Sequence, residues 1–184
     1  MAVELEMRAI ELSMAALYRL PQDVYLSFNV SPKTVTTGVL HRTLNGLPLE
    51  KLVLEITEHA TVSDYSKLLE ALAPLRTKGI RLAVDDAGAG YASFRHILQL
   101  QPDIIKLDMS LTRDIDTDSA RRALASALIL FAHETGSKIV AEGVETASEL
   151  KVLRSLGVNK AQGYLLGRPA PLAAALSLCS EATA

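Results

Sequence analysis

The chain has 184 residues and a formal net charge of −2, and 49% of it is hydrophobic, as expected of one soluble globular domain. The near-neutral balance argues against a basic nucleic-acid surface, so no DNA or RNA partner is expected. The one cysteine, Cys179, excludes an internal disulfide and favours a cytoplasmic location. The chain has no apolar run of about 18 residues, so the sequence predicts no membrane-spanning segment. A closed eight-stranded α/β barrel usually needs about 250 residues, so this chain is short for that fold.

Helical and strand patterns alternate along the chain. Apolar spacing and flanking Pro or Gly predict helices over residues 3–20, 32–44, 62–78, 93–100, 120–135, 147–156 and 171–180. Short, mostly apolar runs predict strands over residues 25–30, 52–56, 80–85, 104–107, 138–141 and 162–166. This order indicates one α/β domain with a parallel sheet of about six strands covered by helices.

Polar residues interrupt these apolar strands at or near their carboxyl ends, where α/β folds gather ligands and catalytic groups. One such residue is usually structural, but five at one edge favour a functional site, because buried charges need partners or a metal. The five residues are Asn29, Glu55, Asp85, Lys106 and Glu142.

The donor atoms in this set favour a hard cation. Asn29, Glu55, Asp85 and Asp86 offer only oxygen, which suits Mg²⁺ or Mn²⁺ better than zinc. The adjacent aspartates could bridge two ions for phosphoester hydrolysis, although such a pair alone is more often a turn or a helix cap.

Lys106 has three interpretations from the sequence alone. It could act beside a metal-bound hydroxide or a phosphate, or form a Schiff base in a different barrel enzyme. The structural alternative is a buried ion pair, for example with Asp108. The spacing of the polar strand ends does not decide among them.

Six stretches of the chain resemble, in order, the motifs of the EAL-domain family of cyclic di-GMP phosphodiesterases. They span nearly the whole chain, and together they are specific for that family. The stretches are Phe28-Asn29-Val30-Ser31-Pro32, Leu54-Glu55-Ile56-Thr57-Glu58, Val84-Asp85-Asp86-Ala87-Gly88-Ala89-Gly90-Tyr91, Pro102-Asp103-Ile104-Ile105-Lys106-Leu107-Asp108, Val140-Ala141-Glu142-Gly143-Val144-Glu145-Thr146 and Gln162-Gly163-Tyr164-Leu165-Leu166-Gly167-Arg168-Pro169.

The resemblance implies a TIM-barrel-like (β/α) fold that hydrolyses cyclic di-GMP to the linear dinucleotide with two Mg²⁺ or Mn²⁺ ions. By motif position, Asn29, Glu55 and Asp85 would hold one metal. Asp85 and Asp86 would hold the second. The family also forms dimers, so the resemblance implies a homodimer.

The remaining roles also follow from motif position. Lys106 would position or activate the attacking water, and Glu142 would be the general base or a partner on the metal side. Gln162 and Asp108 would lie on the substrate side. Glu58 would hold the loop that follows the paired aspartates and helps to form the dimer.

The chain departs from the family pattern in two places. Ala87 stands where phenylalanine is common, and the family's Glu-Ala-Leu strand motif is absent, since the only such triplet, Glu70-Ala71-Leu72, falls in a predicted helix. The resemblance implies that the chain lacks its first strand or strands, and with them one metal-ligand glutamate and an arginine. We therefore expect an incomplete barrel and a weakened first metal site. We also expect the open edge beside the Asn29 strand to be covered, by the N-terminal helix, by a second copy of the chain or by neighbouring molecules in a crystal.

Three functions remain open at this point. The first is a metal-dependent phosphodiesterase domain, whose activity the missing ligand would impair. The second is a cyclic di-GMP receptor or protein-interaction module without turnover. The third, a barrel enzyme that uses Lys106 as a Schiff base, explains only the polar strand ends and ranks last.

Overall fold

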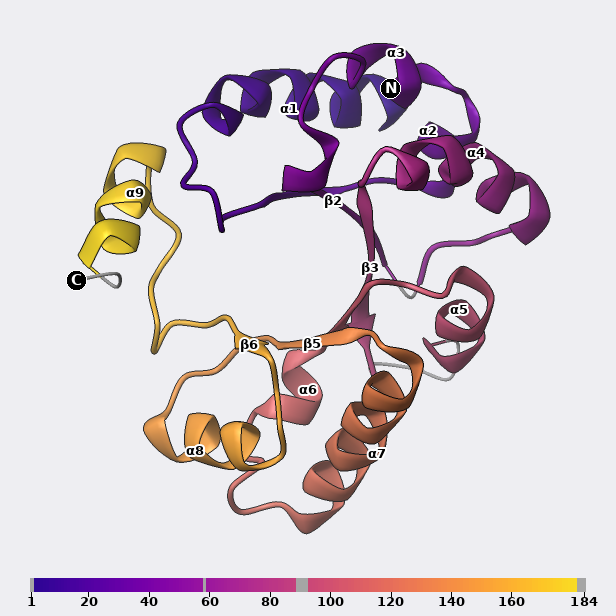
Figure 1. The fold of residues 1–184 in the computed structure, drawn as a ribbon. Helices are drawn as coiled ribbons and strands as arrows, with labels where there is room; N and C mark the ends of the chain where they lie inside the picture. The colour runs from indigo at the N-terminus through magenta and orange to yellow at the C-terminus, as the bar shows by residue number, and fades with distance from the viewer. Residues whose placement is uncertain (1, 58, 89–92, 182–184) are drawn as a thin grey trace.

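The computed structural model describes residues 2–57, 59–88 and 93–181, and shows six parallel strands in one sheet (Figure 1). Each strand pairs with the next along the chain, and the curved sheet is an incomplete barrel with helices on its outer side. This confirms the predicted fold class. The strands are β1 (Leu26–Asn29), β2 (Leu52–Thr57), β3 (Arg81–Ala87), β4 (Ile104–Leu107), β5 (Lys138–Ala141) and β6 (Lys160–Ala161).

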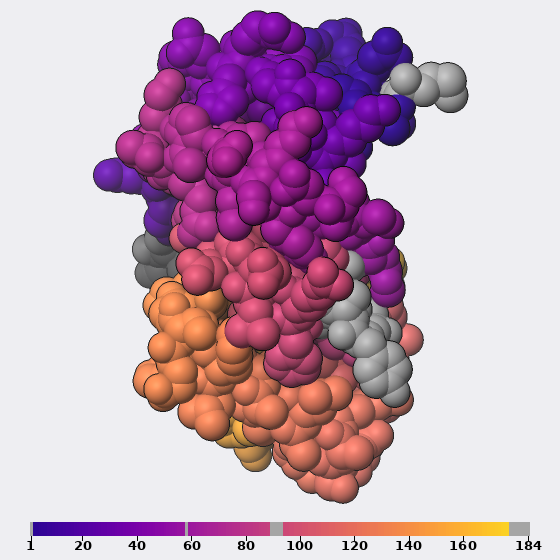
Figure 2. All heavy atoms as spheres, turned by 90° about the vertical axis from the view of Figure 1, so that its right-hand side faces the viewer, coloured from indigo at the N-terminus to yellow at the C-terminus, as the bar shows by residue number. Residues whose placement is uncertain are grey.

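Helices precede, connect and follow these strands, and on the face shown in Figure 2 the N-terminal part of the chain lies at the top and later residues lie toward the bottom. They are α1 (Ala2–Leu17), α2 (Pro32–Thr36), α3 (Val39–Thr43), α4 (Tyr65–Thr77), α5 (Ser93–Leu100), α6 (Met109–Thr112), α7 (Ser119–Thr135), α8 (Ala147–Ser155) and α9 (Leu172–Glu181), with a 3-10 turn at Leu49–Lys51. Among the described residues, none of these helices combines the length and apolar character needed to cross a bilayer.

Local sequence signals explain where several helices begin and end. Ser31 caps α2, with Pro32 at the first helical position, and Asp64 and Asp118 cap α4 and α7 with their carboxylates. Gly136 ends α7 in a left-handed conformation (φ 76°) that favours glycine. These residues mark the ends of the helices that they cap.

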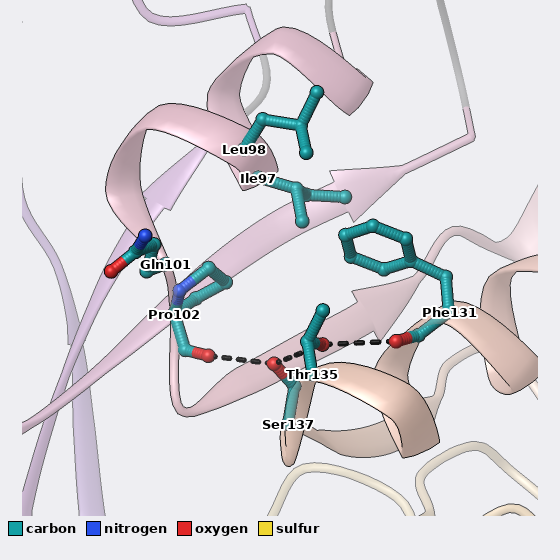
Figure 3. A pocket seen from close by; sticks show the side chains of 7 residues that line it. All are labelled: Ile97, Leu98, Gln101, Pro102, Phe131, Thr135 and Ser137. Carbon is teal, nitrogen blue, oxygen red and sulfur yellow. Dashed lines mark hydrogen bonds between the residues drawn. The ribbon is translucent and has the colours of Figure 1, made fainter.

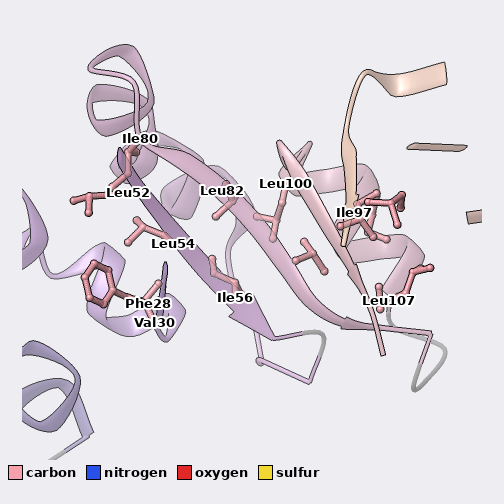
Figure 4. Packing of buried hydrophobic residues seen from close by; sticks show 14 of the residues in the cluster. Phe28, Val30, Leu52, Leu54, Ile56, Ile80, Leu82, Ile97, Leu100 and Leu107 are labelled. Carbon is pink, nitrogen blue, oxygen red and sulfur yellow. The ribbon is translucent and has the colours of Figure 1, made fainter. Parts of the chain in front are cut away.

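The strands alternate their side chains between two environments. In β2, Leu52, Leu54 and Ile56 pack toward the helices in the main apolar core, part of which Figure 4 shows. The intervening residues face the other side, where Val53 belongs to a separate small cluster with Ala83, Ile104 and Val140. Because this alternation has a period of two, Glu55 lies on the same face as Val53, inside the barrel.

Two predicted elements are wrong. The expected helix over residues 32–44 is two short helices, because Gly38 interrupts it with φ 71°. The expected strand over 162–166 lies earlier, at Lys160–Ala161, and the chain then turns, with the N–H groups of Leu166 and Gly167 both donating to the carbonyl of Gly163. The apolar residues of this run lie in a hydrogen-bonded turn and not in a strand.

Candidate functional site

Strand parity and register bring the predicted site residues to one end of the barrel interior. Glu55 in β2 lies directly opposite Asn29 in β1, and Asp85 in β3 lies opposite the last residue of β2. Lys106 in β4 faces inward because its neighbours Ile105 and Leu107 belong to the outer core. Glu142 follows β5 with the same parity as the inner residue Val140.

The ammonium group of Lys106 is the centre of the site. Its Nζ lies 3.0 Å from Oε2 of Glu55, 2.8 Å from Oδ1 of Asp85 and 2.9 Å from Oε1 of Glu142. All four side chains are largely buried, with Lys106 at 10% exposure and Glu142 at 17%. The structure thus contains the buried ion pair that the sequence left open for Lys106, but the partners come from β2, β3 and the end of β5 and do not include Asp108.

A β-bulge places two consecutive carboxylates at the same site. Between β3 and β4 the register shifts so that Asp85 and Asp86 together lie opposite Lys106 alone. Asp86 has a positive φ of 58°, which aspartate tolerates better than most residues. Without the bulge, adjacent residues would point to opposite faces. With it, Asp85, Asp86 and Glu142 each offer an oxygen, and these atoms lie within 4.8 Å of one another.

Burial and mutual repulsion shape the electrostatics of this cluster. Burial raises the pKa of Glu142 to about 7, and the charges of Asp85 and Glu55 add to this effect although Lys106 opposes it. Burial likewise raises the pKa of Asp86, with further contributions from Asp85 and Asp108. A proton therefore leaves Glu142 near neutral pH rather than well below it.

Lys106 is held in its charged form. Burial lowers its pKa, but the surrounding carboxylates of Asp85, Glu55 and Glu142 outweigh burial and raise the pKa above its ordinary value. A Schiff-base lysine needs a neutral amine, so this surrounding disfavours the third function suggested by the sequence.

The donor set fits a divalent cation. Four carboxylates, from Glu55, Asp85, Asp86 and Glu142, face one lysine, so the cluster has an excess of negative charge. Oδ1 of Asp85 is buried and, among the described residues, accepts no well-aligned hydrogen bond although Lys106 lies nearby. Oxygen ligands around a site of this kind suit Mg²⁺, Mn²⁺ or Ca²⁺.

The other predicted residues lie around this cluster. Asn29 is exposed at the end of β1 and lines a pocket of about 440 Å³ together with Glu55. Asp108 caps α6 by accepting a hydrogen bond from the N–H of Ser110, and Gln162 is exposed directly after β6. Glu58, predicted to anchor the loop after Asp86, lies outside the described residues.

The structure also shows supporting residues that the sequence analysis missed. The hydroxyl of Thr112, fully buried in α6, donates to the carbonyl of Glu142. The next residue, Gly143, has φ 66°, and a Cβ there would lie 2.6 Å from Cβ of Met109. The four-residue helix α6 is too short for a periodic signal, so these contacts could not be predicted.

A buried carboxylate holds the segment that follows Gly143. Glu149 accepts hydrogen bonds from the N–H groups of Asp114, Glu145 and Thr146. Although burial opposes it, this donation lowers the pKa of Glu149. The sequence does carry a signal for this role of Glu149, because Thr146 and Glu149 have the spacing of a helix capping box and form one in the structure.

Several known proteins and one family model are similar to this chain in sequence. The model of the EAL domain family matches residues 1–169. The chain is 35% identical over 170 residues to the cyclic di-GMP phosphodiesterase RocR of Pseudomonas aeruginosa, covering 89% of this chain and 43% of RocR. It is 40% identical over 129 residues to the cyclic di-GMP phosphodiesterase NbdA of the same species, covering 70% of this chain and 16% of NbdA. The chain thus spans less than half the length of these curated relatives.

Solved structures show the same fold. A Klebsiella pneumoniae BlrP1 complex with manganese and cyclic di-GMP superimposes with a TM-score of 0.81 at 31% identity, covering 91% of this chain and 45% of that one. The EAL domain of Mycobacterium smegmatis DcpA superimposes with a TM-score of 0.85 at 29% identity, covering 98% of this chain and 86% of that one. The family model, the relatives and the fold agree, and this chain belongs to the EAL domain family.

Proposed function

We propose that this chain is a phosphodiesterase domain that hydrolyses cyclic di-GMP to the linear dinucleotide with Mg²⁺ or Mn²⁺. The observation that carries the proposal is the lysine-centred cluster, in which Lys106 lies 2.8–3.0 Å from three carboxylates beside the bulged Asp86. The relatives named as cyclic di-GMP phosphodiesterases, and the BlrP1 complex with that nucleotide, support the choice of substrate.

The proposed metal ligands are the oxygen donors of the first three strands. Asn29, Glu55 and Asp85 would hold one ion, and Asp85 and Asp86 would hold the second. When bound, such ions supply charge stabilisation at the phosphate and lower the pKa of water. The β-bulge brings Asp85 and Asp86 to the same side of the barrel, so Asp85 could contribute to both sets of metal ligands.

Glu142 and Lys106 carry the proton and charge steps in this proposal. Glu142, with a pKa of about 7, takes a proton from water as the water oxygen bonds to phosphorus. The bond from phosphorus to the ribose oxygen then breaks, that oxygen takes a proton from solvent water, and Glu142 releases the proton it accepted to the solvent. Lys106 stays positively charged and stabilises the negative charge that develops on the phosphate oxygens.

Gln162 and Asp108 are proposed to face the substrate side, and Glu58 to anchor the loop after Asp86. Both Gln162 and Asp108 directly follow strands, and Asp108 also contributes to the raised pKa of Asp86. Alanine at either position should raise KM more than it lowers kcat. If kcat fell by as much as KM rose, or more, the residue would act in the proton-transfer step and not in substrate binding.

The test is turnover of cyclic di-GMP by the purified chain with Mn²⁺ or Mg²⁺. The linear dinucleotide should appear and should be lost in Asp85→Asn and Glu142→Gln. Glu134→Gln is the control, because Glu134 is an exposed carboxylate (72%) on α7. Substitution of Ca²⁺ should abolish turnover, because the larger ion fits a compact two-metal geometry poorly.

A receptor without turnover is the second candidate. It is favoured by one observation, since the Glu70-Ala71-Leu72 triplet lies in α4 and not on a strand, so it does not supply the family's ligand glutamate. Saturable binding of cyclic di-GMP with no linear product, from a folded protein, would establish the receptor. Turnover that depends on Asp85 would exclude it.

A homodimer in the cytoplasm is the proposed state of the molecule. The outer face of α5 exposes Phe94 (43%) and Leu98 (59%), beside a pocket of about 360 Å³ with mixed apolar and polar walls that includes Phe131 of α7 (Figure 3). Because α5 follows the strand that carries the paired aspartates, a second copy docked here would support the active site. Leu98→Asp should reduce self-association in sedimentation experiments, whereas an unchanged monomer in both proteins would contradict the dimer.

A further inference from the structure

The N-terminal helix brings a carboxylate to the end of the first strand. Oε2 of Glu6 in α1 accepts hydrogen bonds from the backbone N–H of Ser31 (2.9 Å) and from its hydroxyl (3.2 Å). Ser31 stands two residues after Asn29, so the contact joins segments that lie 25 residues apart in the chain. Glu6 is half-buried.

This contact lies on the unpaired side of β1. Within the described residues, β1 pairs with β2 alone, and the N–H of Val30 donates to the carbonyl of Glu55 on that side (2.9 Å). Successive N–H groups of an extended chain point in opposite directions, so the N–H of Ser31 points away from β2. The carboxylate of Glu6 therefore takes the place that a neighbouring strand's carbonyl would have.

The same contact fixes the start of the next helix. The hydroxyl of Ser31 accepts the N–H of Thr34 (3.3 Å) as the cap of α2, while it donates to Glu6. Thus α1, the end of β1 and the start of α2 meet at one serine. The pocket of about 440 Å³ that Asn29 and Glu55 line also has Glu6 in its wall.

We propose that Glu6 is a positioning residue for Asn29. The side chain of Asn29 is exposed, so core packing does not fix it, and its backbone is held by β2 on one side and by Glu6 through Ser31 on the other. By holding the turn after β1, Glu6 keeps Asn29 opposite Glu55, so that the side-chain amide of Asn29 stays on the side of the proposed metal site. This inference rests on the proposed role of Asn29 as a metal ligand.

The first experiment measures Mn²⁺ binding by electron paramagnetic resonance in four forms of the full chain. Glu6→Ala should weaken binding at the Asn29 site about tenfold, the usual size of effects from groups that orient a ligand. Glu6→Gln should keep most of the affinity, because its amide oxygen can still accept the Ser31 N–H. Glu11→Gln is the control, since Glu11 lies on the same helix, exposed, in a surface pair with Arg8.

The second experiment needs no metal. In the unmodified protein the amide proton of Ser31 should exchange slowly with solvent, and it should exchange faster in Glu6→Ala but not in Glu6→Gln. Thermal unfolding of each variant separates this local effect from global destabilisation. The readout concerns geometry alone, so it holds whether or not the chain turns over cyclic di-GMP.

Three results would overturn the positioning role. Unchanged Mn²⁺ affinity in a folded Glu6→Ala variant would show that Asn29 does not depend on Glu6, and the proposed function would still stand. Equal weakening by Gln and Ala would show that the charge, not the hydrogen bond, matters. Absence of Mn²⁺ binding in the unmodified protein, with slow Ser31 exchange intact, would refute the metal site and with it this role.

Discussion

The two ends of the barrel interior follow the same alternation of side chains but carry opposite charges. At the carboxyl ends of the strands, Lys106 lies among buried carboxylates. At the amino ends, the ring of Tyr25 contacts two cations, with the guanidinium carbon of Arg81 4.6 Å and Nζ of Lys160 4.4 Å from its centroid. The apolar layer of Val53, Ala83, Ile104 and Val140 lies between these two ends.

The difference between the two ends shows which of them can bind a cation strongly. At the amino ends, Lys160 is exposed and shares one aromatic ring with Arg81, so water can solvate its charge. At the carboxyl ends, the charges are buried, they outnumber the lysine, and their pKa values are displaced. A cation can therefore gain most at the carboxyl end, in agreement with the usual place of active sites in α/β barrels.

The largest effect is expected from Lys106→Met. Removal of the ammonium group leaves Glu55, Asp85 and Glu142 without their shared cation, so metal-free unfolding should be easier by about 3–5 kcal/mol. Turnover should fall by about 10²–10³-fold, because the charge that stabilises the phosphate oxygens is lost. Denaturant titration and the nucleotide assay check both effects. A variant of unchanged stability and activity would show that the two ends do not differ as described.

A smaller effect is expected from Gly143→Ala, which alters the backbone beside Glu142. Its left-handed φ and the approach of Met109 should together cost about 2 kcal/mol and lower kcat. The matched control is Gly157→Ala, which also has positive φ (91°) but meets no atom within 4 Å. Thermal unfolding should show the control to be milder, and equal losses would mean that the contact with Met109 is unimportant.

The raised pKa of Glu142 predicts that the free energy of unfolding depends on pH through a group at the carboxyl ends of the strands. Because its folded-state pKa of about 7 exceeds the ordinary 4.5, folding favours the protonated form. The stability gained from it is present below about pH 4.5 and is lost as the pH rises through 7. Denaturant titrations of the metal-free protein across this range should show this loss, which Glu142→Gln should reduce. Parallel curves for the two proteins would contradict it.

The smallest effect is expected from Lys160→Met at the amino end. Loss of the contact with Tyr25 should cost about 0.5–1 kcal/mol, the usual value of an exposed cation–π contact, and should leave turnover unchanged. Comparison with Lys106→Met sharpens the contrast, because the same chemical change is made at both ends. A loss of activity in Lys160→Met would show that the two ends are coupled.

Much of the site could be predicted from the sequence because period-two alternation is local. Leu54 and Ile56 flank Glu55 in β2, and Ile105 and Leu107 flank Lys106 in β4, so the polar residue of each strand must face away from the apolar core. The side chain direction follows from the extended backbone alone. The alternation of strands and helices then implied a parallel sheet and a common edge for these residues.

Other features depend on contacts between distant segments, which no local pattern encodes. The bulge at Asp86 appears only when β3 pairs with β4, and the partners of Lys106 are set by the register of four strands. The predicted strand over 162–166 is wrong for the same reason, because an apolar run does not reveal whether its backbone pairs with a neighbouring strand or forms a turn.

The sequence by itself therefore determined the order of elements, the inward face of each strand and the residues at the carboxyl ends. Only the tertiary structure decided that Lys106 binds three carboxylates, that Asp85 and Asp86 share one side, and that Glu6 holds Ser31. The physical reason is range. Alternation and capping act over a few residues, whereas charge pairing and register join residues that are 21 to 51 positions apart.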